Sequence, residues 1–325
     1  MVFENKSIFY TLYKTDSILK MSGIDYLKKG DTVAIVAPAR KISQEETRPF
    51  IHALENAGYK VIVTPHLYGQ SNQYSGTDEE RIADFQMLLD SSEVKAIFCA
   101  RGGYGSMRII DALDFSHFRE HPKWICGYSD ITVFHAHLNG MGFSSMHAAM
   151  PVNVTEENSD SLSMRSLLAV LKGEEVCYNM SYCSLNRPGK VEAPLCGGNL
   201  SMLYALQGSP SALHAEGKIL FIEDLDEYLY HIDRMMVNLK RSGLLADIAG
   251  LLVGGLSDMH DNSIPFGKTA EEIVYEHVAA YNYPVCFGFP AGHADPANNA
   301  AIPFGQMASL QVDGDGSQLH VCPLY

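Results

Sequence analysis

The chain has 325 residues, of which 46% are hydrophobic and 19% charged, and 38 acidic against 24 basic residues give a net charge of −14 at pH 7. This composition is typical of a globular protein with one large or two ordinary domains. The negative charge argues against a nucleic-acid groove or an anionic membrane surface as the partner. None of the seven cysteines forms a CxxC pair, so we expect free thiols rather than a disulfide framework.

The segment 1–22 shows no clear periodicity, and we interpret it as an N-terminal extension. It contains neither the apolar core nor the small-residue cleavage site of a signal peptide. No other segment approaches the ~20 consecutive apolar residues that cross a bilayer as a helix. We therefore expect a cytoplasmic protein.

Apolar runs alternate with amphipathic segments through the first half of the chain. The runs predict buried strands at 31–39, 59–65, 94–100 and 123–128. The segments between them predict helices at 43–58, 77–90 and 106–113. For the first of these helices we expect Ser43 as the N-cap, with Glu46 at capping-box distance. This alternation predicts an α/β fold with a parallel sheet, in which ligands bind beyond the carboxyl ends of the strands.

The second half begins less regularly. The polar stretch 156–190 predicts a linker between a first domain, 23–155, and a second domain, 191–325. Within the second domain we expect strands at 218–224, 248–256 and 283–290, a helix at 231–243, and short antiparallel strands in the tail.

Two turns at predicted strand ends are candidates for a site. In "GYSDIT", Ser129 follows a strand and precedes a helix, where a nucleophile would face the backbone N–H groups of the new helix. The full G-x-S-x-G pattern is not met, and a simple helix cap is the other interpretation. In "ARGGYG", the adjacent Gly102 and Gly103 allow the backbone to approach a ligand closely, although an ordinary tight turn has the same pattern.

Carboxylates and a histidine follow two later strands. Glu223 ends the predicted strand 218–224 and opens "EDLDE", where a carboxylate can orient a histidine, bind a cation or belong to a solvated loop. His293 lies in the loop "GHADPANNAAIPFG", where it is a candidate general base or simply an exposed histidine. The spacing of His135 and His137 places them on different faces of a helix, and no zinc motif is present, so we expect no metal site.

Taken together, ordered blocks resemble the LD-carboxypeptidase family of serine peptidases. They run from "GDTVAIVAPA" through "ARGGYGSMRIIDALDF", "GYSDIT", "SMHAAMP", "GGNLSML" and "LFIEDLDEYLYHIDRMM" to "GHADPANNAAIPFG". The resemblance implies a Rossmann-like parallel-sheet N-terminal domain and a smaller, strand-rich α/β C-terminal domain, with the active site in the cleft between them.

The resemblance also implies a catalytic triad of Ser129 as nucleophile, His293 as base and Glu223 as orienting acid. Glu227 is the competitor for the acid. Implied oxyanion donors are the N–H of Asp130 and an N–H of Gly102 or Gly103, and Asn199 in "CGGNL" is a candidate for binding the substrate carboxylate.

The implied reaction hydrolyses an L,D amide bond and releases the C-terminal D-alanine of a murein tetrapeptide during peptidoglycan recycling. The resemblance implies no cofactor, a small peptide or muropeptide as partner, and a homodimer, as in many family members. Two alternatives stay open. One is an immunity-type peptidase that cleaves a peptidyl or aminoacyl-nucleotide antibiotic, and the other is a non-catalytic two-lobed protein that binds a small ligand.

Overall fold

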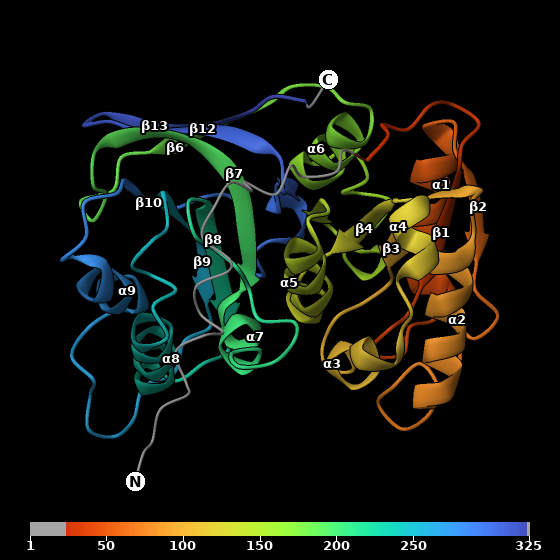
Figure 1. Cartoon of the computed structure of the whole chain (residues 1–325), viewed down its shortest axis with the longest axis horizontal. Coiled ribbons are helices and arrows are strands. Elements are labelled where there is room, and N and C mark those ends of the chain that lie inside the picture. The colour runs from red at the N-terminus through yellow and green to blue at the C-terminus, as the bar shows by residue number, and fades with distance from the viewer. Residues whose placement is uncertain (1–23, 324–325) are drawn as a thin grey trace, which may run out of the picture.

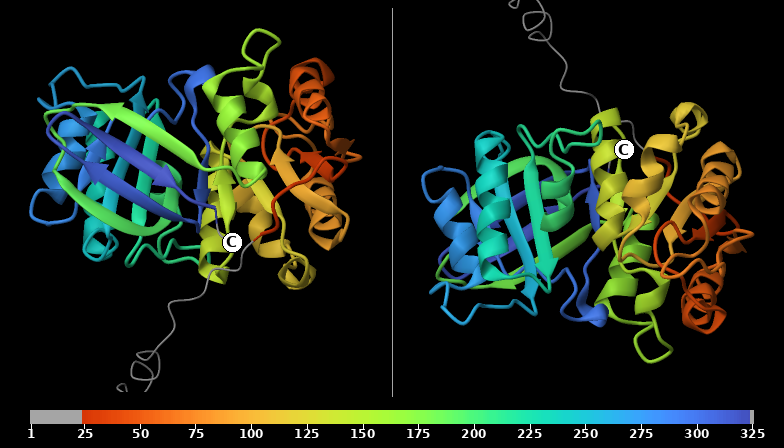
Figure 2. Two further views of the ribbon diagram at one scale, coloured as in Figure 1. Left: turned by 90° about the horizontal axis from the view of Figure 1, so that it is seen from above. Right: turned by 90° about the horizontal axis from the view of Figure 1, so that it is seen from below.

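The computed structural model describes residues 24–323, so the extension 1–22 lies outside the described residues. Two sheets lie side by side, a six-stranded one built mainly from the first half of the chain and a seven-stranded one from the second half (Figure 1). The same arrangement is visible from above and from below (Figure 2). The predicted two-domain α/β fold is therefore confirmed. Within the described part of the chain, no helix is long and apolar enough to cross a membrane.

The first sheet is parallel except at one edge. Its strand order is β11-β5-β4-β3-β1-β2, and β11 pairs antiparallel with β5. The 2-1-3-4-5 order within it is that of a doubly wound sheet, which binds ligands where the strand order reverses, here between β1 and β3. The strands are β1 (Thr32–Val36), β2 (Lys60–Val63), β3 (Val94–Cys99), β4 (Trp124–Gly127), β5 (Ser145–His147) and β11 (Ile302–Phe304).

Within residues 24–323, six α-helices belong to this half of the molecule. They are α1 (Gln44–Asn56), α2 (Asp78–Asp90), α3 (Ser106–Ile109), α4 (Ser116–Glu120), α5 (Thr132–Met141) and α6 (Leu162–Leu171). The predicted capping box at the start of α1 is confirmed, because the Ser43 hydroxyl accepts from the Glu46 N–H while the Glu46 carboxylate accepts from the Ser43 N–H. Gly58 follows α1 with a φ of +97°, a conformation that glycine adopts without strain.

The second sheet is mixed. Its order is β10-β9-β8-β7-β12-β13-β6, parallel from β10 to β7 and antiparallel from β7 to β6. The strands are β6 (Val176–Ser181), β7 (Gly189–Asn199), β8 (Ile219–Leu225), β9 (Gly250–Ser257), β10 (Val285–Phe287), β12 (Met307–Val312) and β13 (Gly316–Val321). The helices are α7 (Leu200–Ala205), α8 (Leu229–Arg241) and α9 (Ala270–Val278).

The segment 156–190, which the sequence predicts to be a linker, contains both α6 and β6. Residues of β6 are alternately buried and exposed, with Val176, Tyr178 and Met180 facing the core. The other face of the strand is exposed and carries Cys177, Asn179 and Ser181, so the sequence shows no continuous apolar run there. The predicted tail strands form, but β11 pairs with the first sheet rather than with its chain neighbours β12 and β13.

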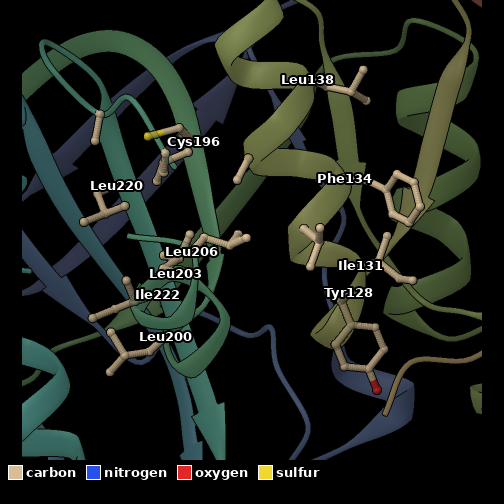
Figure 3. Packing of buried hydrophobic residues seen from close by; sticks show 14 of the residues in the cluster. Tyr128, Ile131, Phe134, Leu138, Cys196, Leu200, Leu203, Leu206, Leu220 and Ile222 are labelled. Atoms are coloured by element: carbon tan, nitrogen blue, oxygen red, sulfur yellow. The ribbon is translucent and has the colours of Figure 1, made fainter. Parts of the chain in front are cut away.

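The two halves meet where α5 packs against β7 and α7. Figure 3 shows Phe134 and Leu138 on the side of α5 that points away from the second half, and Cys196 and Leu200 within the second half, and all four belong to one buried cluster that continues across the contact. A hydrogen bond of 2.9 Å from the N–H of Asn199 to Thr132 Oγ1 crosses the same contact. A shared apolar core of this kind holds the halves in a fixed relation, as two separate cores would not.

Candidate active site

A cavity of about 520 Å³ opens at the carboxyl ends of β1, β3, β4 and β8, and both halves of the molecule line it. From the first half it is lined by residues that include Arg40, Arg101, Gly102, Gly103, Ser129 and Asp130. From the second half it is lined by residues that include Asn199, Asp224, Asp226, Glu227 and His293. The turns after β1 and β3 flank the point where the strand order reverses, which is where this class of sheet binds ligands.

Ser129 is presented by a strained turn between β4 and α5. Its φ is +65°, in the left-handed region that serine rarely adopts. Gly127, two residues before it, has a φ of +155°, and a Cβ there would approach Ile131 Cγ1 to 2.9 Å. This strand–turn–helix geometry is that of a nucleophile elbow, although the sequence pattern is incomplete. Strain of this kind is concentrated at functional sites.

Backbone donors surround Ser129. A Cβ added to Gly102 would lie 3.1 Å from Ser129 Oγ and 3.4 Å from the backbone nitrogen of Asp130. Within residues 24–323 the N–H groups of Gly102 and Gly103 donate to no other residue. Unpartnered N–H groups beside a hydroxyl form the arrangement that stabilises an oxyanion.

The side chain of Asp130 has a separate role. It is 1% exposed, and its Oδ2 accepts from the Ser106 N–H at the start of α3, at 2.8 Å. Burial raises the pKa of Asp130 and outweighs the lowering effect of that hydrogen bond. The carboxylate thus joins the turn after β3 to the turn after β4, which places Gly102 against Ser129.

His293 and Glu223 form a close pair. His293 Nδ1 lies 2.7 Å from Glu223 Oε2, and the Glu223 side chain is completely buried. His293 Nε2 has no hydrogen-bond partner among the described residues, and the ring of Tyr128 lies 4.7 Å from the His293 ring. Ser129 and His293 line the same cavity but are not hydrogen-bonded to each other. Bonds of this type often tighten only when substrate binds.

The electrostatics of the pair favour a charged imidazole. Burial alone would lower the pKa of His293, but the hydrogen bond and negative charge of Glu223, with the charge of Asp224, outweigh burial and raise it. Burial also raises the pKa of the neighbouring Asp224 to about 7, and the charge of Glu223 adds to this effect. A carboxylate that stabilises a protonated histidine in this way is a feature of base–acid pairs in hydrolases.

An irregularity in β9 brings the His293 loop to Glu223. The pairing of β8 with β9 shifts between Ile222 and Asp224, so that Gly254 and Gly255 lie opposite Glu223 without regular partners. The N–H of Gly255 donates to the carbonyl of Ala291 at 2.9 Å, and a Cβ on Gly254 would approach that oxygen to 2.5 Å. Glycines in a bulge therefore allow the loop to cross the strand closely.

Asn299 holds the other side of this loop. Its Oδ1 accepts from the Gly292 N–H at 3.0 Å and lies 3.1 Å from Nε2 of the buried His147. Burial lowers the pKa of His147 to about 3, so the ring is neutral and donates to the asparagine. The loop is thereby fixed next to His293.

Several sequence candidates have partners elsewhere. Glu227, the competitor for the acid, lines the cavity but bonds to Nδ1 of His231. Asn199 is 3% exposed and its amide donates to Asp224 Oδ1 at 2.9 Å. His135 and His137 bond to different partners, Ser145 and Ser211.

The cavity also contains residues that the sequence did not single out. Tyr128 packs against His293, while Arg40 and Arg101 supply the positive charge of the lining. The two arginines follow the carboxyl ends of β1 and β3. Because parallel sheets of this kind bind ligands beyond the carboxyl ends of their strands, this position could have identified both residues from the sequence.

The chain is similar to known proteins along most of its length. A model described as the LD-carboxypeptidase N-terminal domain matches residues 33–148, and one described as the LD-carboxypeptidase C-terminal domain matches residues 192–310. The probable murein peptide carboxypeptidase of Bacillus subtilis (strain 168) is 36% identical over 292 residues, which cover 87% of this chain and 90% of the relative.

Two further relatives extend the similarity. The murein tetrapeptide carboxypeptidase of Pseudomonas aeruginosa is 28% identical over 289 residues, which cover 86% of this chain and 92% of the relative. The crystal structure of muramoyltetrapeptide carboxypeptidase from Oxalobacter formigenes has a TM-score of 0.80 at 27% identity and covers 90% of this chain and 98% of its own.

Proposed function

Since the chain belongs to the LD-carboxypeptidase family, we propose that it is a serine LD-carboxypeptidase that releases the C-terminal D-alanine from murein tetrapeptides. The observation that carries the proposal is the cavity lined by both Ser129 and His293, with His293 bonded to the buried Glu223. The similarity to murein peptide carboxypeptidases supports the choice of substrate.

In the proposed mechanism each of these groups has one role. His293 Nε2 takes the proton of Ser129 as Oγ attacks the carbonyl carbon of the scissile amide. The N–H groups of Asp130 and of Gly102 or Gly103 stabilise the resulting oxyanion. His293 then gives the proton to the nitrogen of the leaving D-alanine, and water hydrolyses the acyl-enzyme by the same base. Throughout, Glu223 holds the imidazole tautomer and stabilises its charged form.

The lining of the cavity supports a peptide rather than a nucleotide substrate. Among the residues that line it, Tyr128 is the single aromatic side chain, and its ring already packs against His293. A nucleotide-bearing antibiotic would need an aromatic surface on which its base could stack. Polar groups and charges dominate the rest of the lining, in keeping with a short peptide that carries several charges.

The decisive experiment is mass spectrometry of a murein tetrapeptide incubated with the wild type and with Ser129→Ala. We expect the wild type to remove the mass of one D-alanine residue and the variant to leave the peptide intact. Turnover that survives in Ser129→Ala would remove the nucleophile assignment. If the wild type cleaves a peptidyl-nucleotide but not the tetrapeptide, the immunity-type function replaces the proposed one.

The proposal includes a cytoplasmic location and a homodimer. A cytoplasmic enzyme would act on muropeptides that have been returned from the cell wall, and many members of the family are dimers. Cell fractionation tests the location, and light scattering coupled to gel filtration tests the dimer. Recovery outside the cytoplasm or elution as a monomer would contradict the respective part.

A further inference from the structure

An enzyme that removes only a terminal residue must recognise the free carboxylate of that residue. The cavity offers two walls of opposite charge for this purpose. Arg40 and Arg101 lie on the wall from the first half, and Asp224, Asp226 and Glu227 lie on the wall from the second. Like charges close together repel by several kcal/mol when poorly solvated. The carboxylate is therefore expected on the wall from the first half.

Asn199, which the sequence indicates as a candidate for binding this carboxylate, lies on the negatively charged wall. Its amide nitrogen donates to Asp224 Oδ1 at 2.9 Å, and its carbonyl oxygen accepts from Ser201 Oγ at 2.7 Å and from the Met202 N–H at 3.2 Å. The amide is thus occupied by Asp224 of β8 and by the first turn of α7. A substrate carboxylate next to it would also lie beside the carboxylate of Asp224, which disfavours binding.

The two arginines differ in their partners. Arg101 is paired with Glu46, with 3.3 Å between Nη1 and Oε1. Arg40 is within ion-pair distance of no carboxylate in residues 24–323, and its side chain makes no hydrogen bond there. A cation that lines a cavity without a partner is available to a ligand, whereas a paired cation must first break its existing interaction.

Arg40 is also fixed next to the groups around Ser129. Its N–H donates to the carbonyl of Gly102 at 3.3 Å, and Gly102 is the residue that contacts Ser129. Its side chain crosses Gly103, where an added Cβ would lie 2.4 Å from Arg40 Cδ. Because Gly103 has no side chain, the guanidinium can extend over the turn that is proposed to bind the oxyanion.

The distance along the substrate matches this arrangement. The terminal carboxylate lies one residue beyond the scissile carbonyl, a step of about 3.5 Å along an extended chain. Gly102 and Gly103 are likewise one residue apart, with Ser129 against the first and Arg40 against the second. If the scissile carbonyl is held at Gly102, a carboxylate one residue further on is within reach of the side chain that lies against Gly103, which is Arg40.

We propose that Arg40 forms the subsite that binds the C-terminal carboxylate of the substrate and so restricts the enzyme to the terminal peptide bond. The proposal rests on the proposed function and deepens it. The planar guanidinium binds a carboxylate through two parallel hydrogen bonds, which neither a carboxamide nor an internal peptide bond can reproduce. Arg40 is a binding residue for the leaving group and takes no part in proton transfer.

The test compares a murein tetrapeptide with its C-terminal carboxamide as substrates of the wild type, Arg40→Gln, Arg40→Lys and Arg101→Gln. We expect the wild type to prefer the free acid by roughly 10–100-fold in kcat/KM, the range of a charge-assisted bidentate contact. Arg40→Gln should cleave both peptides equally, mainly through a raised KM for the acid. Arg40→Lys should restore part of the preference, and Arg101→Gln should keep it.

The outcomes separate this inference from the proposed function. If Arg40→Gln keeps the preference of the wild type, or if Arg101→Gln abolishes it, the assignment to Arg40 is wrong while the peptidase function stands. Calorimetry in the Ser129→Ala background measures acid and amide binding without turnover. Equal affinities for the two peptides there would overturn the subsite even if neither peptide is cleaved. Because Arg40 is exposed, Arg40→Gln and Arg40→Lys should melt at the temperature of the wild type.

Discussion

His293 Nδ1 lies 2.7 Å from Oε2 of Glu223, a carboxylate with no exposed surface. The two residues come from the loop after β10 and from β8, and a bulge in β9 lets them meet. A buried carboxylate bonded to one ring nitrogen fixes the imidazole and leaves the other nitrogen for chemistry.

Two replacements of Ser129 distinguish the backbone strain at this residue from its role in catalysis. Ser129→Ala and Ser129→Gly should both lose at least about 10³-fold in kcat, because neither side chain can attack a carbonyl. Ser129→Gly should also be more stable than Ser129→Ala by about 1 kcal/mol, since only glycine adopts a φ of +65° without strain. Tetrapeptide hydrolysis and urea unfolding measure the two effects. Equal stabilities would show that the turn stores no strain.

Glu223 and Glu227 can be distinguished by matched variants. Glu223→Gln should lower kcat by about 10³–10⁴-fold, because an amide can donate to Nδ1 and so stabilise the wrong tautomer. Glu227→Gln should have an effect of less than about tenfold, since the partner of Glu227 is His231 rather than His293. Steady-state kinetics on both variants decides between the two glutamates. The reverse order of effects would move the acid role to Glu227.

The pH profile should report the raised pKa of His293. The base must be neutral to accept a proton, so kcat/KM should rise as the pH increases through this pKa. The hydrogen bond and charge of Glu223 raise it against the effect of burial, and the ascending limb should therefore lie above about pH 6.5, the ordinary value. In Glu223→Gln the limb should move to lower pH. An unmoved limb would show that the titration belongs to another group.

The same shift affects stability. A histidine with a raised pKa contributes stability that is complete below its unfolded pKa and is lost as the pH rises through its folded pKa. The free energy of unfolding of the wild type, measured relative to His293→Gln, should therefore be larger at about pH 5.5 than at about pH 9. Urea titrations at both pH values measure this difference. If the stability of the wild type relative to His293→Gln instead increases with pH, burial outweighs Glu223 and lowers the pKa of His293.

Two alanine substitutions in the turn after β3 should have different main effects, one on the rate of catalysis and the other on stability. Gly102→Ala should fold normally but lose at least about 10²-fold in kcat, because its Cβ would lie 3.0 Å from Ser129 Cβ and occupy the space for the oxyanion. Gly103→Ala should lose about 1 kcal/mol of stability, since its φ is +100°, and its Cβ should displace the Arg40 side chain and so raise KM rather than lower kcat. Thermal unfolding and kinetics distinguish the two. A fully active Gly102→Ala would place the oxyanion elsewhere.

Local chemistry was sufficient to predict many individual elements. The capping pattern of Ser43 and Glu46 predicted the start of α1, and the apolar spacing over 231–243 predicted α8, whose buried side chains include Ile232 and Met235. The alternation of strands and helices predicted the parallel first sheet. These features depend on neighbours within a few residues, so the sequence alone determines them. Their places after predicted strands singled out Ser129, Glu223 and His293 as candidates, and the resemblance to a family gave them their roles.

Only the tertiary structure decided how distant segments combine. It showed that β6 completes the second sheet although it lies in a segment that looked like a linker, and that β11 returns to the first sheet. It also distinguished Glu223 from Glu227, although the two lie four residues apart in one acidic stretch. A bulge brings His293 to Glu223, whereas Glu227 bonds to His231. Pairing of strands and convergence of side chains depend on contacts across the whole chain, which no local pattern of residues encodes.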